Sequence, residues 1–207
     1  MKFFYITIFL TSTLLANVKA NVVEIVKDIP YVKVESHGKT YKIERTQEKD
    51  AYLTNTFALT SRPSPPFFIQ PFSVSKDVET YAELEVLDFL TKKKGLFIDA
   101  RLENWYEKSA IPTAINIPFK LFLSESKERE KVLKNLGATY NKDGSWDFSS
   151  AKTILLYCNG AWCGQSPTAI KALLEIGYPA KKMKYYRGGM QSWQLLGLTT
   201  IVPKEAK

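Results

Sequence analysis

The sequence predicts an α/β domain with a central, mostly parallel β-sheet. From residue 77 onwards, short and mostly apolar runs suited to buried strands alternate with longer segments whose apolar residues recur at helical spacing. This alternation is typical of a parallel sheet whose connecting helices cover both of its faces. The chain has 207 residues, 45% of them hydrophobic, which is enough for one core of ordinary size and an extension.

Strands and helices can be placed along this region in order. Leu84, Leu87 and Leu90 recur at helical spacing before Gly95, which indicates a helix that ends at the glycine. The run 153–157 carries no charge and is the clearest strand of the chain. The expected strands are residues 96–100, 115–118, 153–157 and 183–186. The expected helices are residues 81–93, 125–136, 167–176 and 190–196.

The first 20 residues are typical of an export signal. Lys2 supplies a positive start, an apolar stretch follows, and Val18-Lys19-Ala20 forms a small-residue cleavage region. Thr7, Thr11, Ser12 and Thr13 interrupt the apolar stretch, so we expect no stable membrane span after cleavage. We therefore expect an exported protein, periplasmic or secreted, in a compartment that permits disulfides.

Residues 21–76 are expected to form an N-terminal extension. Two alternating runs, 31–36 and 40–45, flank the turn residues His37-Gly38 and predict a β-hairpin. Residues 62–71 are rich in proline, which removes backbone donors and fixes an extended path. This Pro-rich strap is expected to pack along its own domain.

The charge of the chain favours a small-molecule or thiol partner. The formal net charge is +8, but the lysines are scattered, without the dense basic stripe or the module typical of nucleic-acid binding. We therefore expect no nucleic-acid partner. Two cysteines and His37, which we expect to be structural, make a poor ligand set, so neither a metal site nor a cofactor is expected.

The chemistry is expected at Cys158, which directly follows the strand 153–157. In open α/β sheets, ligands bind at the carboxyl ends of the strands. Ser166 is placed as the N-cap of the next helix, with Pro167 at its first position. The backbone N–H groups of the intervening loop can converge near the positive helix end and stabilise a thiolate or persulfide. The substrate loop comprises Asn159, Gly160, Ala161, Trp162, Cys163, Gly164 and Gln165, and ends at Ser166.

Four segments, in order, resemble the rhodanese homology domain. They are Leu96-Phe97-Ile98-Asp99-Ala100-Arg101, Ile111-Pro112-Thr113-Ala114-Ile115-Asn116-Ile117-Pro118, the strand that leads to Cys158, and Tyr186-Arg187-Gly188-Gly189-Met190-Gln191-Ser192-Trp193. The resemblance covers residues 77–202 and leaves 203–207 as a tail. It implies a rhodanese-like, three-layer fold with a five-stranded sheet. It also implies a sulfurtransferase that holds sulfane sulfur as a persulfide on Cys158 and passes it to a small sulfur compound or a protein thiol.

The loop after Cys158 departs from the pattern of that family. It has seven residues instead of the usual five before the helix cap, and it contains no Arg or Lys. Arg187 could supply the missing cation, because Arg187-Gly188-Gly189 should approach the same sheet edge. Asp99 and Arg101 are expected to form a structural ion pair, and a place for Arg101 near the substrate is the alternative. Trp162 either walls the pocket or packs the longer loop.

Cys163 leaves a second mechanism open. The loop could bring its sulfur to disulfide distance from Cys158, so the two cysteines could serve as an attacking and resolving pair. The alternatives are therefore a thiol–disulfide oxidoreductase, a fixed structural bridge, or two independent thiols. A non-catalytic rhodanese-like binding module is the remaining alternative.

Overall fold

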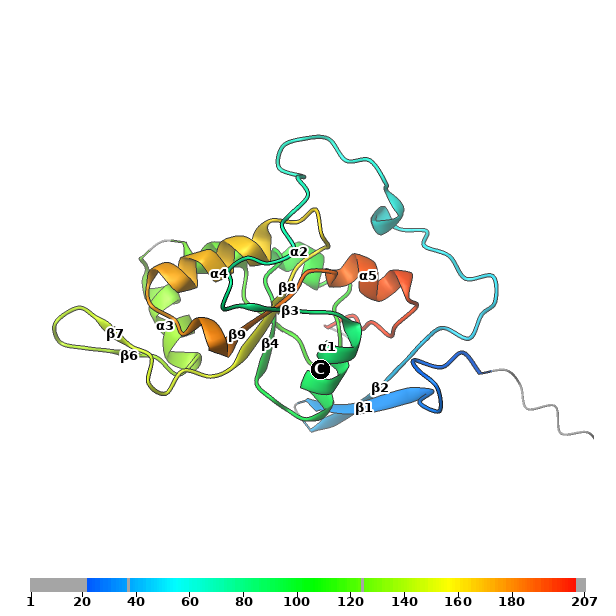
Figure 1. The fold of residues 1–207 in the computed structure, drawn as a ribbon, viewed down its shortest axis with the longest axis horizontal. Coiled ribbons are helices and arrows are strands. Elements are labelled where there is room, and N and C mark those ends of the chain that lie inside the picture. Colours follow the sequence, from blue (N-terminus) through cyan, green and yellow to red (C-terminus); the bar gives the residue numbers. More distant parts are fainter. Residues whose placement is uncertain (1–21, 37, 124, 204–207) are drawn as a thin grey trace, which may run out of the picture.

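The computed structural model describes residues 22–203 apart from residues 37 and 124 (Figure 1). The expected export signal and His37 lie outside the described residues, as does most of the expected tail. Within the described part of the chain, no helix is long and apolar enough to cross a membrane.

A five-stranded parallel sheet forms the centre of the molecule, as the sequence predicts. Its strands are β3 (Glu79–Tyr81), β4 (Leu96–Asp99), β5 (Ile115–Asn116), β8 (Ile154–Tyr157) and β9 (Met183–Tyr186). The spatial order is β3-β9-β8-β4-β5, and every neighbouring pair is parallel. Strand β8 lies in the middle of the order, which places the residue after it at the centre of the carboxyl edge.

Helices cover both faces of this sheet (Figure 1). Ile154 and Leu156 of β8 pack into the core on the side of α3 (Lys127–Asn135) and α4 (Gln165–Glu175). Leu155 and Tyr157 pack into the opposite core, with α1 (Glu83–Thr91) and α5 (Gly189–Leu195). Side chains of successive strand residues point to opposite faces, so a fully buried strand needs apolar residues at every position.

Shorter elements connect these layers. They are the helix α2 (Glu103–Tyr106), the 3-10 turns η1 (Thr56–Ala58), η2 (Phe119–Phe122) and η3 (Ala180–Lys182), and the strands β6 (Thr139–Tyr140) and β7 (Trp146–Asp147). Strands β6 and β7 pair antiparallel, with residues 141–145 between them.

The expected N-terminal hairpin is confirmed and belongs to the second core. Strands β1 (Tyr31–Ser36) and β2 (Lys39–Glu44) pair antiparallel. Their inward residues Val34 and Ile43 are buried in the same cluster as α1 and α5. Residues 62–71 contain no helix or strand. The extension is therefore packed onto the domain by apolar contacts.

The predicted starts of α1 and α3 are wrong. Tyr81 was expected at the start of a helix, but it ends the edge strand β3, and α1 begins at Glu83. The Glu85 carboxylate accepts a hydrogen bond from the Ala82 backbone N–H, which fixes the start of α1 with one residue between the strand and the helix. Helix α3 likewise begins at Lys127 and not at Glu125, because the Ser126 hydroxyl accepts from the Arg129 N–H and caps it.

Candidate active site

Cys158 lies at the carboxyl end of β8, between the sheet and the start of α4. Its side chain is buried, with only 2% of the residue exposed. The strand before it is buried at all four positions, so the chain enters the loop from the interior of the protein. The thiol is therefore shielded from solvent.

The loop is fastened to the start of α5 by its backbone. The Met190 N–H donates to the Cys158 carbonyl at 3.0 Å, and the Gln191 N–H donates to the Asn159 carbonyl at 2.9 Å. Gly189 adopts φ +54°, and a Cβ there would lie 2.3 Å from the Cys158 carbonyl oxygen. The close approach of the two backbones thus requires glycine at this position.

Helix α4 begins two residues earlier than expected, which corrects the role of Ser166. Gly164 is the N-cap, and the Thr168 N–H donates to its carbonyl at 2.9 Å. Pro167 still lies in the first turn, where helix N–H groups have no intrahelical partner. Ser166 is fully buried inside this turn, and its hydroxyl caps nothing.

The thiol of Cys158 has a pKa well below its usual range. Burial alone raises the pKa, but hydrogen bonds from the Cys163 side chain, the Ser166 hydroxyl, and the Ser166 and Gly160 N–H groups outweigh it and lower the pKa to about 7. As a thiol, Cys158 donates to the Cys163 carbonyl at 3.1 Å. The Ser166 hydroxyl has no fixed acceptor in the described structure, so its proton is available once Cys158 is a thiolate.

Cys163 is a free, buried thiol with the opposite character. Burial raises its pKa well above the usual value, and the nearby Cys158 raises it further. Its Sγ donates weakly to Gln165 Oε1 at 3.6 Å, and Asn159 Nδ2 approaches the sulfur at 3.9 Å. Cys163 therefore stays protonated at neutral pH and can donate a hydrogen bond to the Cys158 thiolate, so the two sulfurs are chemically distinct.

Asp99 and Arg101 form a buried ion pair at the end of β4. Arg101 Nη2 lies 2.5 Å from Asp99 Oδ2, and the exposed fractions of the two side chains are 1% and 0%. Arg101 also donates to the Ser109 carbonyl, and the Tyr157 hydroxyl donates to Asp99 at 2.7 Å. Burial opposes the charged guanidinium, but the hydrogen bond and charge of Asp99 raise the pKa of Arg101, and the charge of Cys158 adds a smaller contribution. The pair thus joins the end of β4 to Tyr157 and to the Ser109 carbonyl.

Arg187 approaches the same sheet edge, where it holds the Pro-rich strap. Its Nη2 and Nε donate to the Gln70 carbonyl at 2.8 Å and 3.1 Å. The Gln70 N–H in turn donates to the Ala161 carbonyl at 2.7 Å. The strap therefore packs against the outside of residues 159–165, the loop after Cys158, which we call the active loop. No pattern in the sequence indicates this contact.

Trp162 joins the loop to both the strap and α5. Its ring meets that of Phe67 edge to face at 5.3 Å between centroids. Its Nε1 donates to Gln191 Oε1 at 2.7 Å, and Gln191 Nε2 donates to the Phe57 carbonyl at 2.8 Å. Because a glutamine side chain can accept and donate at once, Gln191 links the loop to the extension.

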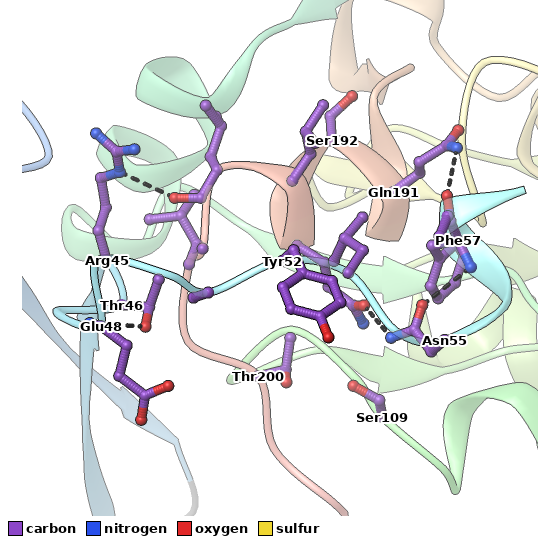
Figure 2. A pocket seen from close by; sticks show the side chains of 18 of the residues that line it. Arg45, Thr46, Glu48, Tyr52, Asn55, Phe57, Ser109, Gln191, Ser192 and Thr200 are labelled. Carbon is purple, nitrogen blue, oxygen red and sulfur yellow. Dashed lines mark hydrogen bonds between the residues drawn. The ribbon is translucent and has the colours of Figure 1, made fainter. Parts of the chain in front are cut away.

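A cavity of about 1040 Å³ lies behind this link, between the extension and α5. Figure 2 shows Gln191 bonded to Phe57 at one end of it and Arg45 at the other. Asn55 Nδ2 donates to Gln194 Oε1 at 2.7 Å, and Arg45 Nε donates to the Leu196 carbonyl at 2.9 Å. The extension is thus held to α5 along this cavity by polar contacts.

Tyr185 is a site residue that the sequence analysis did not single out. Its hydroxyl is buried without a hydrogen-bond partner among the described residues, and so is Asn159 Oδ1. Burial raises the pKa of Tyr185, and the charge of the Cys158 thiolate adds to the rise. The one sequence signal that could have indicated Tyr185 is its polar hydroxyl within a buried strand. The hydroxyl lies in the electrostatic environment of both sulfurs and can donate to an anion there.

The described residues contain no cluster of three or more His, Cys, Asp or Glu side chains that could hold a metal ion. The site consists of a buried thiol with a lowered pKa, a protonated second thiol and several donors.

A central parallel sheet with a buried cysteine of lowered pKa in the loop after its middle strand places this chain in a class of α/β proteins with that architecture. Residues 83–196, more than half of the chain, match the family model "Rhodanese-like domain". The chain belongs to the rhodanese-like domain family.

Individual relatives cover parts of the chain. A helix-turn-helix-type transcriptional regulator of Mycobacterium tuberculosis is 31% identical over 101 residues, which are 49% of this chain and 35% of that protein. The chain thus spans about a third of this curated relative.

Solved structures also resemble the chain. A Bacillus halodurans protein is 25% identical, with a TM-score of 0.40, over 57% of this chain and 72% of that one. A rhodanese with anions from E. coli is 23% identical, with a TM-score of 0.33, over 51% of this chain and 95% of that one. A human single-domain sulfurtransferase is 15% identical, with a TM-score of 0.40, over 58% of this chain and 96% of that one.

The lowered pKa of Cys158 predicts a pH profile. Alkylation of Cys158 by iodoacetamide should rise with a midpoint near pH 7, because the pKa is about 7. Ser166→Ala removes one donor to the thiolate and should raise the midpoint by about one unit. Ser149→Ala, at an exposed serine bonded to Asp147, is the matched control and should not move it. A midpoint near 9 in the unaltered protein would contradict the assignment of the donors.

Proposed function

We propose that this protein transfers sulfane sulfur, which it carries as a persulfide on Cys158. The observation that carries the proposal is the Cys158 thiol itself, buried after β8 with its pKa lowered to about 7. About half of such a thiol is ionised at neutral pH, against roughly three in a hundred at the ordinary value. A thiolate is the attacking form in sulfur transfer.

The transfer takes two steps. The Cys158 thiolate attacks the outer sulfur of a donor, so that an S–S bond forms at Sγ and the donor's own bond to that sulfur breaks. The leaving group departs with the electron pair, as sulfite does from thiosulfate. An acceptor thiolate then attacks the outer sulfur of the Cys158 persulfide. The acceptor then leaves as a persulfide that carries the transferred sulfur, and the Cys158 thiolate is regenerated.

The groups that lower the pKa of Cys158 are suited to hold the intermediate as well. The persulfide is an anion one atom longer than the thiolate, and it needs donors in a confined space. Gly160 and Ser166 offer N–H groups, while the Cys163 thiol and the Ser166 and Tyr185 hydroxyls offer further protons. Acceptors of this reaction would be small sulfur compounds or protein thiols, in an exported, periplasmic or secreted protein.

Mass spectrometry of the intact protein after incubation with thiosulfate or inorganic polysulfide tests the proposal. We expect a gain of about 32 Da, the mass of one sulfur, localised to Cys158. Cys158→Ser should abolish the gain, and Cys163→Ser should keep it. Addition of an excess of a small thiol should return the mass to its starting value.

Two outcomes would overturn the proposal. A loss of about two hydrogens without any gain of sulfur would indicate a Cys158–Cys163 bridge and disulfide exchange. No change in mass with either donor, in a protein whose Cys158 still reacts with iodoacetamide, would leave a rhodanese-like module without transfer activity.

A further inference from the structure

Arg62 lies on the outer wall of the active loop. Its guanidinium carbon is 3.7 Å from the centroid of the Trp162 ring, and its Nη2 donates to the Thr56 carbonyl at 2.5 Å. The guanidinium also lies 5.6 Å from the centroid of the Phe67 ring. Stacking on an indole face fixes the plane of an arginine and leaves its edge free for hydrogen bonds.

This guanidinium has no counter-charge of its own. Among the described residues no carboxylate forms an ion pair with Arg62. Its Nε is buried and has no hydrogen-bond acceptor within the described structure. Burial lowers the pKa of Arg62, and an ionised Cys163 would raise it. The stacking on Trp162 places the cation beside the loop that follows Cys158. A buried cationic donor without an acceptor is unfavourable unless an anion binds it.

The other arginines near the site are already engaged. Arg101 is committed to Asp99 and Ser109, and Arg187 to the Gln70 carbonyl. The loop after Cys158 contains neither Arg nor Lys. Of the guanidinium nitrogens of these three arginines, Arg62 Nε is the one that is buried without a hydrogen-bond partner in the described part of the chain.

We propose that Arg62, brought to the active loop by the Pro-rich strap, is the specificity residue of this site and selects an anionic sulfur donor. The inference rests on the proposed sulfur transfer at Cys158 and makes the N-terminal extension a part of the substrate site. Arg62 acts on the approach and orientation of the donor, and the attacking group remains Cys158. Arg187 contributes by holding the strap in place.

Paired reagents of equal shape and different charge test Arg62 without any need for sulfur transfer. Iodoacetate is an anion and iodoacetamide is neutral, and each alkylates the thiolate with release of iodide. In a Cys163→Ser background, so that only Cys158 reacts, the ratio of the iodoacetate rate to the iodoacetamide rate should fall about tenfold on Arg62→Gln. Arg62→Lys keeps the charge and should retain most of the ratio.

Lys131→Gln removes one positive charge from the exposed face of α3 and is the matched control, whose ratio should not change. High salt should lower the ratio of the parent towards that of Arg62→Gln. An unchanged ratio in Arg62→Gln, or an equal fall of both rates, would overturn the proposal, since the second result means only a displaced strap.

The rate of persulfide formation from thiosulfate then separates this proposal from the one on which it rests. We expect a fall of about tenfold or more in Arg62→Gln, because thiosulfate is a dianion. If the unaltered protein takes up no sulfur but the alkylation ratio falls as expected, sulfur transfer is wrong and the anion-selecting role of Arg62 stands. If sulfur is taken up and neither ratio nor rate changes, Arg62 has no such role.

Discussion

Replacing Gly189 with alanine should destabilise the protein by about 2–5 kcal/mol and displace the loop that carries Cys158. Gly189 has φ +54°, where an L side chain is strained. The new Cβ would meet the Cys158 carbonyl oxygen at 2.3 Å and the Gly160 nitrogen at 2.8 Å. Both are backbone atoms, which cannot rotate away as a side-chain end can. The hydrogen bond from Met190 to Cys158 would have to lengthen to relieve the contact.

Gly38→Ala is the matched control for this substitution. Gly38 also has a positive φ, +74°, but nothing lies within 4 Å of a Cβ built there. It should cost about 1–2 kcal/mol, from backbone strain alone. Chemical denaturation gives both free energies of unfolding, and iodoacetamide titration reports the loop. The prediction is contradicted if both variants lose the same free energy of unfolding and the alkylation midpoint of Cys158 stays near pH 7. The close contact between Gly189 and Cys158 would then not be needed for stability or for the position of the loop.

The sheet could be predicted from the sequence because its buried strands have to be apolar at every position. β8 is the clearest case, with Ile154 and Leu156 on one face and Leu155 and Tyr157 on the other. β3 was missed because it has only three residues and lies at the edge, where Glu79 is exposed and no apolar run marks it. Tyr81 therefore looked like the first residue of the following helix. The number of five strands came from the family resemblance.

The place of Cys158 could also be predicted, because a residue that follows a central parallel strand must lie at the carboxyl edge of the sheet. The residues that surround the loop could not be predicted from the sequence. Arg62 and Gln70 reach the loop from the strap, and a proline-rich segment without periodic pattern carries no signal of what it packs against. Ser166 was misplaced as a cap because its type and its neighbour Pro167 fit that position, while its burial against Cys158 depends on tertiary packing.

Asp99→Ala should destabilise the protein by about 3–5 kcal/mol, because it leaves the Arg101 guanidinium buried without its counter-charge. Arg101 Nε and Nη2 both donate to the Asp99 carboxylate, and the side chain has 1% exposure, so it cannot turn to water. The Tyr157 hydroxyl would lose its acceptor in the same step. Urea denaturation measures the loss. Asp99 bonds Tyr157, the residue before Cys158, and Arg101 interacts electrostatically with Cys158, so the variant should also alter the alkylation midpoint of that thiol.

Two comparisons show whether the orphaned charge is the cause. Glu130→Ala breaks the exposed pair with Lys134 on α3 and should cost less than about 1 kcal/mol. The double variant Asp99→Leu with Arg101→Met removes both charges and keeps much of the buried volume. It should therefore be more stable than Asp99→Ala alone, since an apolar pair in place of a buried ion pair is often tolerated. If the double variant is instead as unstable as the single one, the hydrogen bonds from Arg101 to the Ser109 carbonyl and from Tyr157 to Asp99 hold this corner of the site together, and the charge does not.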